Sequence, residues 1–187
     1  MHPIPKGRIE QFSDGVFAIA ITLLAIELKI PHVLHMSIGG TFRELLPMIP
    51  SIATFVLSFV TIAIFWVNHQ QLTQSMTNIT RRTLWLNTLL LMFVTLIPFA
   101  TAVATENAGN VLTMTIYNIT LFCTSLSFTL LVANVHKHTQ HRRTIMSRSV
   151  VGPVFYGCAV LAGFIAIPAA YTLLVIPPLF YFLPRDT

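Results

Sequence analysis

Charged residues are scarce in this sequence. Only 9% of its 187 residues are Asp, Glu, Lys or Arg, whereas soluble domains carry charge on roughly a quarter of their residues. Apolar residues make up 55% of the chain, and the mean hydropathy is +0.76. This composition excludes a disordered tail and an ordinary cytosolic enzyme, and it indicates an integral membrane protein.

Cysteine is nearly absent as well. Cys123 and Cys158 both lie in apolar stretches without metal-ligand spacing, which excludes a secreted disulfide scaffold and leaves them as packing residues. The chain also lacks a His-Glu-x-x-His motif, a Gly-x-Ser-x-Gly motif, a Walker loop and a second deep aspartate beside Asp14. We therefore expect no enzyme, no metal site and no cofactor.

Six apolar stretches are present instead, and each is close to the roughly 20 residues that a membrane-spanning helix needs. They predict an all-α membrane protein with a single six-helix domain over residues 1–187, and no cleaved signal peptide is expected because Asp14 and Glu27 interrupt the first stretch. Pro168 is expected to separate the last two spans, while Pro177 and Pro178 leave open a count of five. The predicted spans are residues 11–28, 46–66, 84–104, 111–133, 150–167 and 169–183.

The basic residues are distributed unevenly between the two sides that these spans define. One side receives only Lys29 and Arg43, and the positive-inside rule therefore predicts that both termini are cytoplasmic. A net charge of +5 arranged in short tracts between spans is a topology signal, so we expect no nucleic-acid partner. The other side receives Lys6, Arg8, Arg81, Arg82, Lys137, Arg142, Arg143, Arg148 and Arg185.

The longest predicted loop, residues 134–149, contains His136, His138 and His141. Three histidines can bind a metal ion. We favour a solvated basic loop at the lipid headgroups.

Polar groups within the spans are costly and therefore informative. Asp14 and Ser13 lie near the start of the first span, and they share one membrane depth with a second set of polar groups. A carboxylate at that depth needs hydrogen-bond donors. These residues are expected to form a polar cluster that either only locks the first helix in place or acts directly in transport or proton sensing. The second set is Arg8, Trp66, Asn68, His69 and Asn87.

An aliphatic stripe follows on the first span. Ile19, Leu23 and Ile26 recur at i, i+4 and i+7, and Thr22 borders them. From the residues alone, helix packing explains this stripe better than a pore lining does. Glu27 at the far end is either an entrance charge or an interfacial residue.

The start of the first span carries a more distinctive pattern, Arg8-x-x-x-Phe12-Ser13-Asp14. It resembles the signature of the transmembrane protein 175 family of lysosomal and prokaryotic potassium channels. The second-span ending Phe65-Trp66-Val67-Asn68-His69 and the third-span segment from Leu84 to Phe99 are similar to that family too.

The resemblance implies a homotetramer in which four first helices line a pore that has no Gly-Tyr-Gly filter. Ile19, Leu23 and Ile26 would form its aliphatic constriction, with Thr22 as a polar neighbour. The helix would be held by the motif residues Arg8, Phe12, Ser13, Asp14, Trp66, Asn68 and His69. We therefore expect a weakly selective potassium channel in a bacterial inner membrane, with permeant K⁺ as the only ligand.

Two other functions remain open. A proton-coupled secondary transporter would use Asp14 and His69 as its proton relay. A structural membrane subunit would use its basic loop to bind a partner, and it would show no ion flux by itself.

Overall fold

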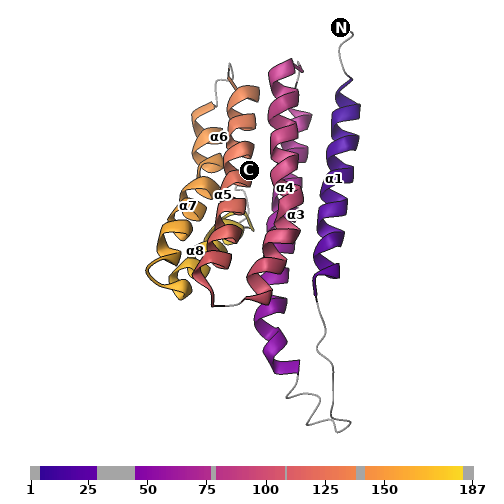
Figure 1. Ribbon diagram of the computed structural model, residues 1–187. Helices are drawn as coiled ribbons and strands as arrows, with labels where there is room; N and C mark the ends of the chain where they lie inside the picture. The colour runs from indigo at the N-terminus through magenta and orange to yellow at the C-terminus, as the bar shows by residue number, and fades with distance from the viewer. Residues whose placement is uncertain (1–4, 29–44, 77–78, 108, 138–141, 183–187) are drawn as a thin grey trace.

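A computed structural model describes residues 5–28, 45–76, 79–107, 109–137 and 142–182. Every regular element in these ranges is helical, which confirms the predicted all-α class. In Figure 1, α1 lies at one edge of the bundle and α7 and α8 lie at the other. The elements are α1 (Lys6–Ile26), the 3₁₀ turn η1 (Leu46–Met48), α3 (Ile49–Gln74), α4 (Arg81–Glu106), α5 (Val111–Val135), α6 (Arg142–Ser149), α7 (Val151–Gly163) and α8 (Ile167–Phe182).

Local signals set the ends of the central helices. The Thr80 hydroxyl accepts the Thr83 amide at 3.1 Å at the start of α4, and the Asn110 side chain accepts the Leu112 amide at 2.8 Å at the start of α5. Such caps satisfy amides that have no partner within the helix. Gly109, with φ of 89°, provides the left-handed residue of the connection between α4 and α5. The two helices therefore form a tight antiparallel pair.

Five stretches in the described residues are long and apolar enough to cross a membrane. They are Lys6–Ile26, Ile49–Gln74, Arg81–Glu106, Val111–Val135 and Ile145–Gly163. The sixth apolar helix, Pro168–Tyr181, is shorter and packs against α7. The chain is thus a multi-pass membrane protein, with five long spans and one shorter helix where the sequence predicts six spans.

Several helix bounds differ from the predicted spans, because hydropathy identifies the apolar part of a helix and not its ends. The first helix starts five residues before residue 11, and α3 continues eight residues beyond Trp66. The segment 134–149, predicted as a loop, contains the last two residues of α5 and all of α6.

The break between the last two helices lies at residues 164–166, one turn before its predicted position at Pro168. Pro168 is instead in the first turn of α8, where its missing N–H leaves no hydrogen bond unmade. The proline therefore starts a helix instead of separating two.

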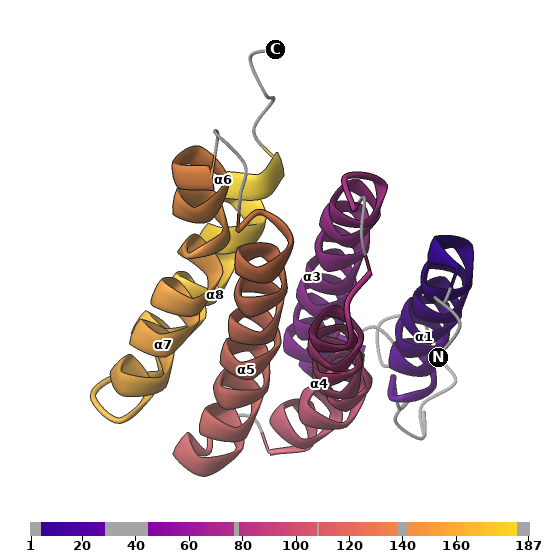
Figure 2. The ribbon, with the colours of Figure 1, turned by 90° about the horizontal axis from the view of Figure 1, so that it is seen from above.

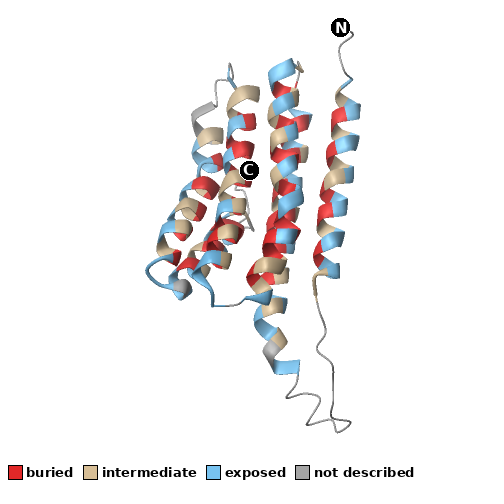
Figure 3. Ribbon diagram, in the orientation of Figure 1, coloured by how far each residue is buried: buried red, intermediate tan, exposed pale blue. Residues whose placement is uncertain are grey.

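The core lies where α4 meets α3 and α5. Ile62, Leu90, Val94, Tyr117 and Leu121 are all fully buried there. Figure 3 shows buried residues throughout the middle of the bundle, whereas α1 is buried along only one side. The outer surface is largely apolar, as a lipid-facing surface must be.

Antiparallel packing gathers the described basic residues toward one end of the bundle, which we call the basic end. The start of α1, the start of α4 and the end of α5 meet there, at the top of Figure 1. The basic residues there include Lys6, Arg8, Arg81, Arg82, Lys137 and Arg148, and Arg142 and Arg143 begin α6.

Candidate functional site

One face of α1 is anchored against α3 and α4. Ser13, Phe17, Ala20 and Leu24 are buried to 1% exposure or less, and Ile9 continues this face toward the basic end. The spacing of three or four residues puts them on one side of the helix. In Figure 2, α1 lies at the edge of the bundle, and among the described helices it contacts α3 and α4.

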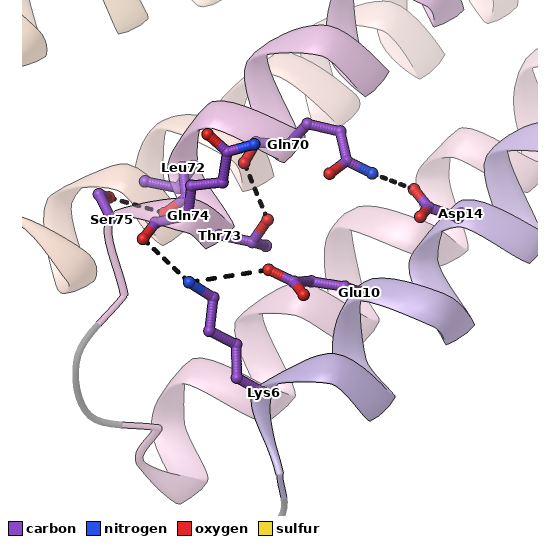
Figure 4. Close-up of polar contacts among 8 residues, drawn as sticks. All are labelled: Lys6, Glu10, Asp14, Gln70, Leu72, Thr73, Gln74 and Ser75. Carbon is purple, nitrogen blue, oxygen red and sulfur yellow. Dashed lines mark hydrogen bonds and ion pairs between the residues drawn. The ribbon is translucent and has the colours of Figure 1, made fainter.

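Asp14 joins α1 to α3 through two donors. The Trp66 indole N–H donates to Asp14 Oδ1 at 2.9 Å, and the Gln70 amide donates to the same oxygen. Trp66 and Gln70 are four residues apart, so they project from the same side of α3. Figure 4 shows Gln70 extended toward Asp14.

His69, Asn87 and Ser13 form a second, fully buried connection. The Asn87 amide nitrogen donates to Ser13 Oγ at 3.1 Å, so its oxygen is left to accept from His69 Nε2 at 2.7 Å. The imidazole must then carry its proton on Nε2. Its Nδ1 is buried and has no hydrogen-bond partner among the described residues, and the Phe17 ring lies 5.5 Å from the His69 ring.

A third contact lies at the basic end. Lys6 Nζ donates to the Gln74 carbonyl oxygen in the last turn of α3 at 2.9 Å, and it lies 3.8 Å from Glu10 Oε1 (Figure 4). A cation at a helix C-terminus interacts favourably with the carbonyl groups that the helix leaves unpaired. The three contacts together span the first two turns of α1.

Arg8, Phe12 and Asn68 lie outside this cluster. Arg8 and Phe12 are on the exposed face of α1, and the Arg8 guanidinium contacts no hydrogen-bonding group within the described ranges. The Asn68 amide donates to Ile64 of its own helix at 2.8 Å. The structure thus unites Ser13, Asp14, Trp66, His69 and Asn87, and it adds Gln70, Lys6 and Glu10.

The spacing of Gln70 from Trp66 could have identified Gln70 as a member of the site, although Gln70 lies outside the family motif. Gln70 is one helical turn after Trp66 and must share its face if the helix continues beyond residue 66. The apolar span was predicted to end at Trp66, so Gln70 was placed outside it.

The aliphatic stripe lies on a face of α1 that is exposed among the residues that the structure describes. Ile19 is 59% exposed, Leu23 41% and Ile26 73%. Thr22 is exposed beside them, and its hydroxyl donates to the Ile19 carbonyl oxygen at 2.9 Å. Phe12, Ile19 and Ile26 follow at intervals of seven residues, which keeps them on one line along the helix.

Other candidate positions are separate from this site. Glu27 is the half-buried residue that ends α1. His136 follows α5, and His138 and His141 lie outside the described residues. Within the residues that the structure describes, no three His, Cys, Asp or Glu side chains are grouped as metal ligands.

The fold and the site together define a multi-pass helical membrane protein. One face of its first helix packs against α3 and α4, and another face is exposed among the described residues. The family described as endosomal/lysosomal potassium channel TMEM175 matches residues 8–98. A lysosomal potassium-selective channel TMEM175 homolog from Chamaesiphon minutus has a closely similar crystal structure, with a TM-score of 0.87 and 30% identity over 97% of this chain and 98% of that one. The chain belongs to the TMEM175 family, which confirms the resemblance inferred from its motifs.

Two curated relatives extend the comparison. A Streptomyces collinus protein named potassium channel is 38% identical over 127 residues, which cover 66% of this chain and 61% of the relative. The human endosomal/lysosomal proton channel TMEM175 is 35% identical over 104 residues, which cover 52% of this chain and 21% of the relative. The matched stretch therefore spans less than two thirds of the length of either relative.

Proposed function

We propose that this protein is a potassium-permeable cation channel of a bacterial plasma membrane, with both termini cytoplasmic. In this proposal four copies assemble so that their α1 helices surround the pore. The names of the bacterial relatives and of the similar crystal structure support potassium as the ion.

The observation that carries the proposal is the bare face of α1. Ile19, Leu23 and Ile26 form an exposed aliphatic line about 110° around the helix from the anchored face. A ring of such side chains, contributed by four copies, excludes ions when it is too narrow for their hydration shells, because no oxygen replaces the lost water. The constriction then acts as the gate, and the Thr22 hydroxyls supply the nearest side-chain oxygens.

The polar contacts of the anchored face explain how α1 could move to open this gate, because they fix the helix at one end. Asp14 and Ser13 hold one side of α1 against α3 and α4 through Trp66, Gln70 and Asn87. These bonds lie at the basic end, whereas the described contacts of the opposite end of α1 are apolar, through Ala20 and Leu24. Opening would widen the ring around Ile19 while the basic end stays fixed.

Ion flux from liposomes that contain only the purified protein tests the proposal. A potassium gradient with a proton ionophore present is expected to drive a flux that does not saturate and that exceeds the sodium flux. Ile19→Asn is expected to raise the resting flux severalfold and to reduce selectivity, because an amide lowers the cost of wetting the ring.

Ile119→Asn is the matched control, because Ile119 is also exposed and lies mid-span, but on α5. Its flux should equal that of the wild type. An Ile19→Asn protein with wild-type flux, or an Ile119→Asn protein that leaks equally, would contradict the gate at Ile19.

A proton-coupled transporter is the second candidate. The observation that favours it is the buried His69 ring, whose Nδ1 has no hydrogen-bond partner among the described groups. Asn87 connects this ring to Ser13, which precedes Asp14 in the chain. A transporter predicts a saturable flux that couples to the proton gradient and disappears in Asp14→Asn. Potassium flux that is independent of the proton gradient excludes it.

A further inference from the structure

A large groove lies on the side of α3 that faces away from α1. Its volume is about 890 Å³, and its walls come from α3, α5, α6 and α8. In Figure 2, α3 lies on one side of α5, and α6 and α8 lie on the other. None of the contacts that anchor α1 involves it, so the groove is independent of the proposed pore.

The groove changes from apolar to polar along its length. Its inner half is lined by Phe59, Val60, Ala63 and Val67 of α3. Its outer half, toward the basic end, still contains the apolar Leu72, Val132 and Ile145. It also holds most of the polar lining, namely Asn68, Gln71, Ser75, His136, Arg148 and Ser149. An amphipathic ligand matches this gradient, with its tail near the middle of the membrane and its polar part near the surface.

The length of the groove corresponds to one leaflet. The α3 lining runs from Phe59 to Ser75, which is roughly 24 Å at 1.5 Å per residue. One leaflet is about 20–22 Å thick when its headgroups are included. A second copy's membrane-spanning helix crosses about 30 Å of hydrocarbon, so it would extend beyond the end of the groove.

The polar end carries an available positive charge. The Arg148 side chain is exposed, and its guanidinium forms no hydrogen bond or ion pair with the described residues. Burial lowers the pKa of His136 below its usual 6.5, so this ring is neutral at pH 7 and Arg148 carries the charge. No acidic residue is among the described residues that line the groove.

The backbone around Arg148 is held firmly. The Tyr181 hydroxyl donates to the Arg148 carbonyl oxygen at 2.9 Å, and the Thr129 hydroxyl donates to the Ser149 carbonyl oxygen at 2.6 Å. These bonds tie the end of α6 to α8 and to α5. The groove therefore has walls on three sides before any ligand arrives.

We propose that this groove binds an anionic phospholipid of the leaflet at the basic end. Arg148 pairs with the phosphate, whose charge is not offset by a headgroup cation in an anionic lipid, and one acyl chain lies along Phe59, Ala63 and Val67. Anionic lipid is attracted to basic residues at the membrane surface. The groove adds a shaped apolar channel to that attraction, so binding depends on the tail as well as on the headgroup.

Native mass spectrometry of the purified, detergent-solubilised assembly tests this site. The probes are a phosphatidylglycerol and a phosphatidylcholine with identical acyl chains. Wild-type protein is expected to retain the phosphatidylglycerol more tightly, and Arg148→Gln to weaken its binding about fivefold, the effect of about one cation at an anionic surface. Arg82→Gln, which removes an exposed cation from α4 at the same end, should leave the affinity unchanged because Arg82 does not line the groove.

A second variant tests the apolar half. Ala63→Trp fills the groove on α3 and should weaken binding of both lipids while the assembly keeps its size. Equal retention of the two lipids by the wild type, or unchanged phosphatidylglycerol binding in Arg148→Gln, would overturn the proposal. If Ala63→Trp instead dissociated the assembly and left lipid binding intact, the groove would be occupied by a second copy of the chain.

Discussion

The Trp66 indole N–H lies 2.9 Å from Asp14 Oδ1, so a tryptophan of α3 directly holds a carboxylate of α1. Asp14 is five residues before Ile19, the first residue of the exposed aliphatic stripe. The orientation of the stripe therefore depends on a hydrogen bond about one and a half helical turns away. This connection makes the polar cluster and the proposed gate parts of one helix whose position is fixed at one end.

Replacement of Trp66 by Phe should destabilise the fold measurably. It removes one of the two donors to Asp14 but retains the Gln70 amide. A hydrogen bond to a charged group contributes about 1.5–3 kcal/mol in soluble proteins, and interhelical bonds in membranes average about 0.6 kcal/mol. We expect a loss of about 1 kcal/mol in the free energy of unfolding, measured by denaturant titration in mixed micelles.

Trp85→Phe is the matched control for this change. Trp85 on α4 is 64% exposed, and its indole makes no hydrogen bond to the described residues. Its replacement should change the free energy of unfolding by less than about 0.5 kcal/mol. Equal losses in the two variants would show that the Trp66–Asp14 bond adds nothing to stability.

Ser13 and Asn87 should behave as a coupled pair. The Asn87 amide donates to Ser13 Oγ within a buried region, and Asn87 is also the only described partner of His69 Nε2. We expect Asn87→Ala to cost more than Ser13→Ala, because it leaves two buried polar groups without a partner. The double variant should cost less than the sum of the single variants by about 0.5–1 kcal/mol. Strict additivity would mean that the bond between α1 and α4 does not form.

Hydropathy predicted the central helices well because their apolar runs are long. It missed the last two turns of α3, which contain His69, Gln70 and Gln74, and it missed α6, which carries Arg142 and Arg143. These segments are polar, and their helical structure comes from contacts with neighbouring helices. The single residue Pro168 could not indicate whether it ended one helix or started another.

The residues of the candidate site were predictable from their types, but the directions in which their side chains point were not. Asp14, Trp66 and His69 stood out because polar groups are rare in apolar spans. Asn68 stood out for the same reason, yet it lies about 200° around α3 from Trp66 and lines the groove on the other side. Arg8 likewise lies on the exposed face of α1. Which way a polar side chain points depends on which helices pack together, and the residue spacing within one span does not specify that packing.

Lys6 should contribute little to stability despite its two contacts. Its ammonium reaches the Gln74 carbonyl oxygen and Glu10, but the lysine side chain is 37% exposed. Exposed ion pairs contribute about 0–1 kcal/mol because water screens them. We expect Lys6→Met to lower the free energy of unfolding by no more than about 0.5 kcal/mol, in the same assay as for Trp66→Phe. If Lys6→Met lowered the free energy of unfolding more than Trp66→Phe does, the Lys6 contact would be the main polar contact that holds α1.

The strongest polar contact in the bundle core should be the one made by Ser58. Its hydroxyl lies 2.8 Å from both the Tyr117 hydroxyl and Thr101 Oγ1, so it connects α3 with α5 and α4. Tyr117→Phe leaves Ser58 with Thr101, whereas Ser58→Ala removes both bonds and leaves the fully buried Tyr117 hydroxyl unpaired.

We expect losses of about 1 kcal/mol for Tyr117→Phe and about 2 kcal/mol for Ser58→Ala. Tyr171→Phe should be close to neutral, because the half-buried Tyr171 hydroxyl has no hydrogen-bond partner among the described residues. Unfolding titrations of the three variants rank them directly. If Tyr117→Phe cost as much as Ser58→Ala, the Ser58–Thr101 contact would carry no energy, and the hydrogen bond from Ser58 to α5 would be the only one of the two that stabilises the core.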